Sequence, residues 1–142
     1  MNRNYAYNID RMRLLQKTSV SLLLPAVIAV LYNQWYNAII YGSMCITSIN
    51  HHTKYTKTSL FIDRTMLTIY TGRLIYITYS DYVFLTIVIL SYSYLFYSYI
   101  YGYYNKCCAF HVDRSKGEKY HAVNHYIGCI IPTIFIILNK TC

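Results

Sequence analysis

The stretch YVFLTIVILSYSYLFYSYIYGYY, residues 82–104, decides the fold of this chain. It contains no charged side chain, and a helix of this length can cross the ~30 Å hydrocarbon core of a bilayer. Residues 91–104 alternate with a period of two, which is also typical of a β-strand. An isolated strand cannot satisfy its backbone hydrogen bonds in lipid, however, and no other stretch has the pattern of a closed barrel. We therefore predict a membrane-spanning helix.

The rest of the chain has a composition that fits the same environment. Of its 142 residues, 56% are hydrophobic and 13% are charged, which excludes an intrinsically disordered protein. Its five cysteines are scattered, which excludes a small secreted disulfide scaffold. Further apolar stretches are found at residues 14–32, 35–52, 59–79 and 120–138. The third is the weakest candidate for a span, because it contains Asp63, Arg64 and Arg73. The sequence predicts an all-α, multi-pass transmembrane helix bundle with about five spans, in which residues 14–142 form a single domain.

The net charge of +8 is divided unevenly between the two sides of such a bundle. Five spans place the amino terminus and the loops at residues 53–58 and 105–119 on the same side of the membrane. This side carries Arg3, Arg11, Arg13, Lys17, Lys54, Lys57, Lys106, Arg114, Lys116 and Lys119, and the other side carries only Lys140. Because short cytoplasmic loops are rich in Lys and Arg, we expect residues 1–13 to be a cytoplasmic N-terminal segment. The partner that the charge indicates is the lipid bilayer, and we expect no nucleic acid.

Four ionisable residues lie at the ends of predicted spans. His52 ends the second span, Asp63 begins the third, and His121 and His125 begin the fifth, so that all four share the cytoplasmic depth. His121 and His125 are four residues apart and therefore occupy one face of a helix, as do Ser48 and His52. Three convergent imidazoles with an open fourth position are the usual ligands of catalytic zinc. The absence of a convergent cysteine also favours Zn²⁺ over iron–sulfur chemistry.

Two other interpretations of these histidines stay open at this point. A His-x-x-x-His pair by itself is a weak signal, and a histidine at a membrane boundary is often only interfacial. A b-type haem is a third alternative, in which His52 and either His121 or His125 are the axial ligands. Haem needs ligands on opposite sides of a flat macrocycle, so one of the three clustered histidines would then have no role.

The pattern Ser48-x-x-x-His52, Asp63, His121-x-x-x-His125 resembles the signature of the alkaline ceramidase and adiponectin-receptor superfamily of membrane hydrolases. In that superfamily a Ser-x-x-x-His closes the second helix, an Asp opens the third, and a His-x-x-x-His lies in the seventh. The ten-residue gap between His52 and Asp63 is most similar to the ceramidase branch. This chain has about five predicted spans instead of seven, so the resemblance is to a shortened and divergent member.

The resemblance implies a zinc-dependent amidase, and it implies a role for each residue of the pattern. His52, His121 and His125 would bind Zn²⁺, which would activate a water molecule. Asp63 would be the general base and then the proton donor to the leaving amine, while Ser48 would orient the water or the substrate carbonyl. The substrate would be a lipid amide such as ceramide.

The sequence also allows a function without catalysis. The alternative is a small multi-pass membrane protein, such as an assembly factor, a receptor-like protein or a pore component, on a degenerate hydrolase scaffold. For either function we expect the protein to reside in an internal membrane such as the endoplasmic reticulum or the Golgi. A homo-oligomer is one partner arrangement that the sequence leaves open.

Overall fold

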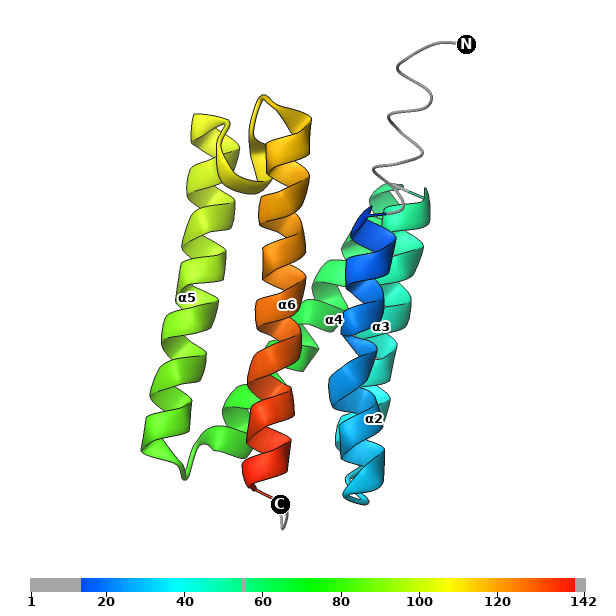
Figure 1. The fold of residues 1–142 in the computed structure, drawn as a ribbon, viewed down its shortest axis with the longest axis vertical. Coiled ribbons are helices and arrows are strands. Elements are labelled where there is room, and N and C mark those ends of the chain that lie inside the picture. Colours follow the sequence, from blue (N-terminus) through cyan, green and yellow to red (C-terminus); the bar gives the residue numbers. More distant parts are fainter. Residues whose placement is uncertain (1–13, 55, 140–142) are drawn as a thin grey trace.

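The computed structural model describes residues 14–54 and 56–139, and these residues form five antiparallel α-helices (Figure 1). Residues 14–31 form the first helix, whose second part is α2 (Leu23–Leu31). The other helices and a short 3₁₀ turn follow in order: α3 (Trp35–Lys54), α4 (Lys57–Thr78), α5 (Tyr82–Asn105), η1 (Cys108–Phe110) and α6 (Arg114–Leu138). No strand is found in the described part of the chain, so the predicted all-α class is confirmed.

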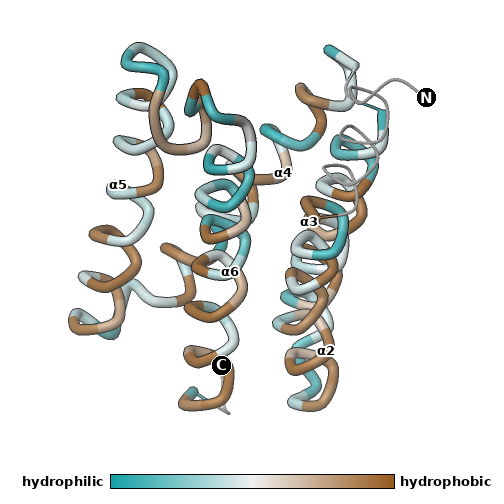
Figure 2. The backbone as a smooth tube through the Cα atoms, turned by 45° about the horizontal axis from the view of Figure 1, so that its top comes forward, coloured by the Kyte–Doolittle hydropathy of each residue, from teal (hydrophilic) through white to brown (hydrophobic). Residues whose placement is uncertain are grey.

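Three of the helices are long and apolar enough to cross a membrane: the helix of residues 14–31, α5 and α6. Figure 2 shows mainly hydrophobic or near-neutral residues along α5, with hydrophilic residues near its ends. Helices α3 and α4 do not reach the same apolar character, because α3 carries several polar side chains and α4 carries Asp63, Arg64 and Arg73. Three such helices fit a membrane protein, and membrane crossing by α3 and α4 stays a prediction.

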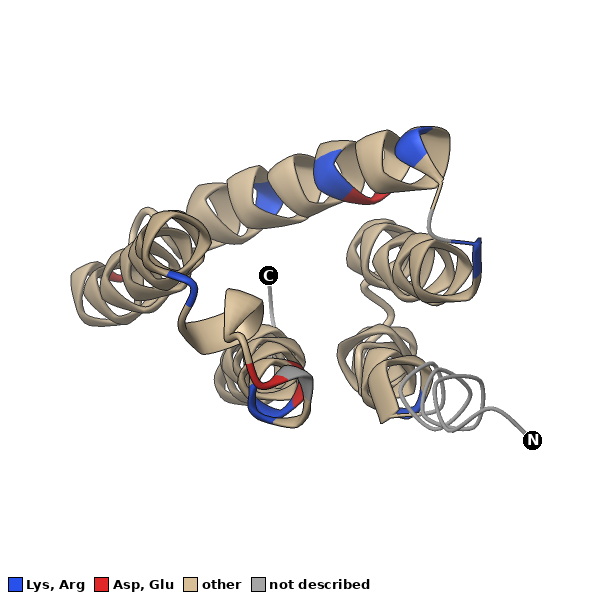
Figure 3. Ribbon diagram, turned by 90° about the horizontal axis from the view of Figure 1, so that it is seen from above, with Lys and Arg blue, Asp and Glu red and all other residues tan. Residues whose placement is uncertain are grey.

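The alternating directions of the helices bring residue 14, the α3–α4 connection and the α5–α6 connection to one end of the molecule (Figure 1). Figure 3 looks onto this end. The connections at the opposite end, residues 32–34 and 79–81, contain no Lys or Arg. Residues 1–13 and Lys140 lie outside the described residues, and the side of the membrane that each end faces stays a prediction.

Helix α4 crosses obliquely behind the other helices, from the end of α3 to the start of α5 (Figures 1 and 3). A capping box of Thr56 and Ser59 begins α4. The Asp81 side chain caps the first turn of the next helix, α5. One buried stripe of α4 contains Ser59, Asp63, Tyr70, Leu74 and Thr78, at spacings of four and seven that keep residues on one helix face.

Helix α6 begins at Arg114, earlier than the predicted span at residue 120, because the Asp113 side chain accepts a hydrogen bond from the backbone N–H of Ser115 at 3.0 Å. Pro132 lies within α6 and has no N–H to donate to the carbonyl of Gly128 four residues earlier. The Tyr70 hydroxyl of α4 donates a hydrogen bond to this carbonyl instead. Tyr70 is 1% exposed, so this bond joins α4 to α6 inside the bundle.

We expect Tyr70→Phe to lower the free energy of unfolding by about 1–3 kcal/mol, because it leaves the buried Gly128 carbonyl without a donor. In a Pro132→Ala background the same substitution is expected to cost less, since the restored N–H of residue 132 can reach the carbonyl. Unfolding in mixed detergent micelles measures both effects. Tyr76→Phe, at an exposed position of α4, is the matched control. An equal loss in the two backgrounds would contradict this account of the proline.

Candidate metal centre

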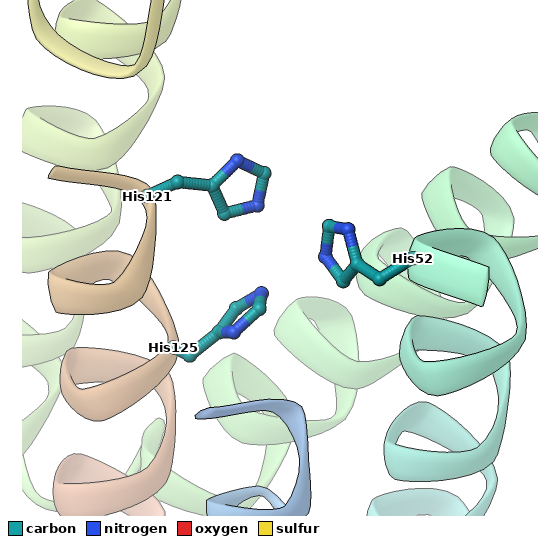
Figure 4. Close-up of side chains that lie close together, drawn as sticks. All are labelled: His52, His121 and His125. Atoms are coloured by element: carbon teal, nitrogen blue, oxygen red, sulfur yellow. The ribbon is translucent and has the colours of Figure 1, made fainter. Parts of the chain in front are cut away.

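Two helix ends position the three predicted histidine ligands. His52 lies in the last turn of α3, and His121 and His125 lie in the third and fourth turns of α6. Because α3 runs toward the end of the bundle at which α6 begins, all three residues lie at about the same level (Figure 4). Figure 4 shows the imidazole of α3 directed toward the two imidazoles of α6. The convergence that the sequence predicts is therefore found in the structure.

The three imidazoles form a nearly equilateral group. Their ring centroids are 5.0 Å apart for His52 and His121, 5.3 Å for His52 and His125, and 5.0 Å for His121 and His125. One ligand nitrogen from each ring lies within 4.8 Å of the other two. Tetrahedral ligands at ~2.0–2.1 Å from an ion are about 3.3 Å from one another, so small side-chain rotations bring the nitrogens to binding distance. The group can hold a metal ion.

The donor set restricts the kind of ion without identifying it. The group consists of imidazole nitrogens alone, since no cysteine or carboxylate of the described residues joins it. Cys45 and Cys129 are buried free thiols elsewhere in the bundle. Imidazole ligands suit zinc and also other first-row divalent ions such as copper and nickel. A metal site is thus compatible with the residues present, and zinc as its occupant stays a prediction.

Asp63 lies in the interior, on the face of α4 that packs toward α3. It is 7% exposed, and its Oδ1 atom has no hydrogen-bond partner among the residues that the structure describes. One turn earlier on the same face, the Ser59 hydroxyl is 3.4 Å from Nδ1 of His51, the neighbour of His52. Asp63 therefore shares the face of α4 that contacts the end of α3. A buried carboxylate oxygen without a partner is rare, and such groups often mark a ligand or catalytic site.

Ser48 is buried one turn from His52, and its Oγ is 3.0 Å from Oγ of Ser19 in the first helix. The adjacent residue Thr18 places its Oγ1 2.9 Å from Nδ1 of His125. Thr18 and Ser19 were not predicted as site residues from the sequence. The available signal was a pair of adjacent hydroxyl residues within a predicted span.

The remaining two histidines are not part of the group. His51 is half-buried beside Ser59. Nδ1 of His111 accepts a hydrogen bond from the backbone N–H of Asp113 at 2.8 Å in the connection before α6. His111 therefore has a local structural role and serves as a control position for metal binding.

A small cavity of about 180 Å³ adjoins the histidine group at the same end of the bundle. It is lined by Leu15, Ala109, Phe110, His111, Gly117, Glu118 and His121. Glu118 is 9% exposed and lies one turn before His121 on α6. The cavity leads from the connection between α5 and α6 to the His121 side chain, so small polar molecules have a place next to the candidate metal centre.

We expect the purified chain to bind one divalent ion, and His125→Ala to abolish this binding because two imidazoles cannot replace three. Equilibrium dialysis against Zn²⁺ or Co²⁺ followed by elemental analysis measures the stoichiometry. His111→Ala is the control and is expected to bind the ion as the wild type does. Equal loss in both variants, or unchanged binding in His125→Ala, would show that the ion is held elsewhere.

In comparisons with protein-family models, with curated proteins and with solved structures, the chain matches none.

Proposed function

We propose that this chain is an integral membrane, zinc-dependent hydrolase that cleaves a lipid amide bond, as the resemblance to alkaline ceramidases implies. The observation that supports the proposal most strongly is the group of His52, His121 and His125, drawn from two helices to one level of the bundle. Three imidazoles leave a fourth position for water or substrate, which is the arrangement of catalytic rather than structural zinc sites.

These three histidines would hold the ion through their ring nitrogens. A bound divalent ion supplies a Lewis acid and makes a water molecule more acidic. Asp63 is assigned the role of general base. Its Oδ1 atom is committed to no bond within the described part of the protein, so it is available to accept a proton from the attacking water and then to deliver it to the leaving amine.

Ser48 has a hydrogen-bonding pattern that suits an orienting role. The Ser19 hydroxyl donates to the Leu15 carbonyl at 2.7 Å, so Ser48 is the donor in the 3.0 Å contact between the two serines. The lone pairs of Ser48 Oγ then stay available to accept a hydrogen bond from water, one helical turn below His52. We assign Ser48 to water orientation for this reason.

The position of the site favours a lipid substrate. His121 and His125 lie near one end of α6, a helix that is long and apolar enough to cross a bilayer. In a membrane this end would lie at the depth of the lipid carbonyl groups close to the headgroups. Acyl chains would stay in the hydrocarbon layer, and the cavity beside His121 would admit water from the headgroup side. With the basic connections cytoplasmic, as the sequence predicts, the site would face the cytosolic leaflet of an internal membrane.

We expect Asp63→Asn to reduce amide hydrolysis by about 10²–10⁴-fold, the usual contribution of general acid–base catalysis, without loss of the metal. The substrate is a fluorescent ceramide in vesicles that contain the zinc-loaded protein. Asp81→Asn is the matched control, because Asp81 caps α5 at the opposite end of the bundle. Retained turnover in Asp63→Asn, or equal loss in Asp81→Asn, would contradict the assignment.

A non-catalytic function is the second candidate, and the exposure of α5 favours it. In the most apolar 18-residue stretch of Tyr82–Phe110, which contains α5, only 17% is buried. The corresponding share is 39% for the helix of residues 14–31 and 39% for α6. A helix this exposed is able to pack against another membrane protein or against a second copy of the chain. Wild-type protein that holds its metal, forms stable oligomers and hydrolyses no lipid amide would support this second function.

A further inference from the structure

Thr18 connects the first helix of the bundle to the candidate metal centre. Its side chain is 3% exposed, and its Oγ1 atom lies 2.9 Å from Nδ1 of His125, which is 107 residues away in the sequence. His125 is itself 8% exposed, so water does not compete freely for this contact. The contact occupies one of the two ring nitrogens of His125 and leaves only Nε2 for a metal ion.

The second contact that Thr18 makes favours one direction of this hydrogen bond. Its hydroxyl is also 3.1 Å from the backbone carbonyl oxygen of Leu15, which can only accept. A hydroxyl has a single hydrogen, and when this hydrogen goes to Leu15 the oxygen accepts from the Nδ1–H of His125. A neutral imidazole that is protonated on Nδ1 has its lone pair on Nε2, which is the form that can bind a metal.

We infer that Thr18 is a positioning residue, which holds His125 as its Nδ1–H tautomer and directs Nε2 toward His52 and His121. This inference rests on the proposed metal centre. In metal sites, a ligating histidine usually donates its other ring N–H to a fixed acceptor, and loss of that acceptor weakens metal binding. The acceptor in this chain is a threonine hydroxyl from a helix that supplies no ligand.

The neighbouring residue extends the same connection to the other ligand-bearing helix. Ser19 contacts Ser48 of α3, one turn from His52, while Thr18 contacts α6. Residues 18 and 19 therefore bind the first helix to both α3 and α6 near the level of the histidine group. Rotation of the first helix about its own axis would therefore break both the Thr18–His125 contact and the Ser19–Ser48 contact.

Thr133 provides a control for the general effect of removing a buried threonine hydroxyl from this bundle. It lies on α6 with His125, is 8% exposed, and donates to the Cys129 carbonyl at 2.7 Å. Its hydroxyl thus makes the same kind of helical contact that Thr18 makes with Leu15, and among the described residues it has no hydrogen bond to a histidine. Thr18→Val and Thr133→Val remove the same group from similar surroundings.

The first measurement is the affinity of the full chain in detergent for Zn²⁺, by competition with a chromophoric chelator. Thr18→Val is expected to bind the ion about 10–100-fold more weakly, the usual effect of losing such an acceptor. Thr18→Ser, which keeps the hydroxyl, and Thr133→Val are expected to bind as the wild type does. Equal affinity of Thr18→Val and wild type would overturn the inference.

The second measurement needs no metal and no activity. Nitrogen-15 NMR of histidine-labelled, metal-free protein distinguishes the two neutral tautomers, and His125→Gln assigns the signal. We expect Nδ1–H for His125 in the wild type and a shift toward Nε2–H in Thr18→Val. An Nε2–H signal in the wild type would overturn the inference. Nδ1–H in a wild-type protein that binds no metal would instead refute the proposed function and leave the tautomer assignment of His125 in place.

Discussion

The structure depends on one constraint: in lipid, each membrane-crossing segment must satisfy its own backbone hydrogen bonds, and so it forms a helix. Short connections then force successive helices to alternate in direction. This alternation places the end of α3 and the beginning of α6 at one end of the bundle, although their histidines are about half the chain apart. The i, i+4 spacing of His121 and His125 and the position of His52 complete the group without any further specialised element.

Polar side chains are concentrated in the interior at this end of the bundle. Thr18, Ser19, Ser48, His52, Asp63 and His125 are all buried there. Farther along the helices the interior is formed mainly by apolar and aromatic side chains, such as Tyr41, Leu74 and Phe135. Fewer buried polar residues lie toward the opposite end, namely Gln34, Asn37, Thr78 and Thr133. Buried polar groups are costly unless they are paired, so such a concentration is expected where it supports binding or catalysis. The hydroxyls of Thr18 and Ser19 provide hydrogen-bond partners for His125 and Ser48. Oδ1 of Asp63 has no hydrogen-bond partner among the described residues.

The sequence predicted the helices and the histidine group because both follow from local patterns. Apolar runs located the five helices, and span order and helical spacing were sufficient to bring His52, His121 and His125 together. The contacts of Thr18 and Ser19 could not be predicted, since they depend on how the first helix is rotated against α3 and α6. The hydrogen bond from Tyr70 to Gly128 could not be predicted either. Pro132 shows which carbonyl lacks its helical N–H donor, but it does not show which distant hydroxyl donates to that carbonyl instead.

The most direct test of the central claim is X-ray absorption spectroscopy of the zinc-loaded, detergent-purified chain, which reports the atoms that surround the ion. We predict nitrogen neighbours at ~2.0–2.1 Å with the multiple scattering of three imidazole rings, and fewer rings in His52→Ala. A sulfur neighbour at ~2.3 Å, or a spectrum without imidazole scattering, would contradict a centre formed by His52, His121 and His125.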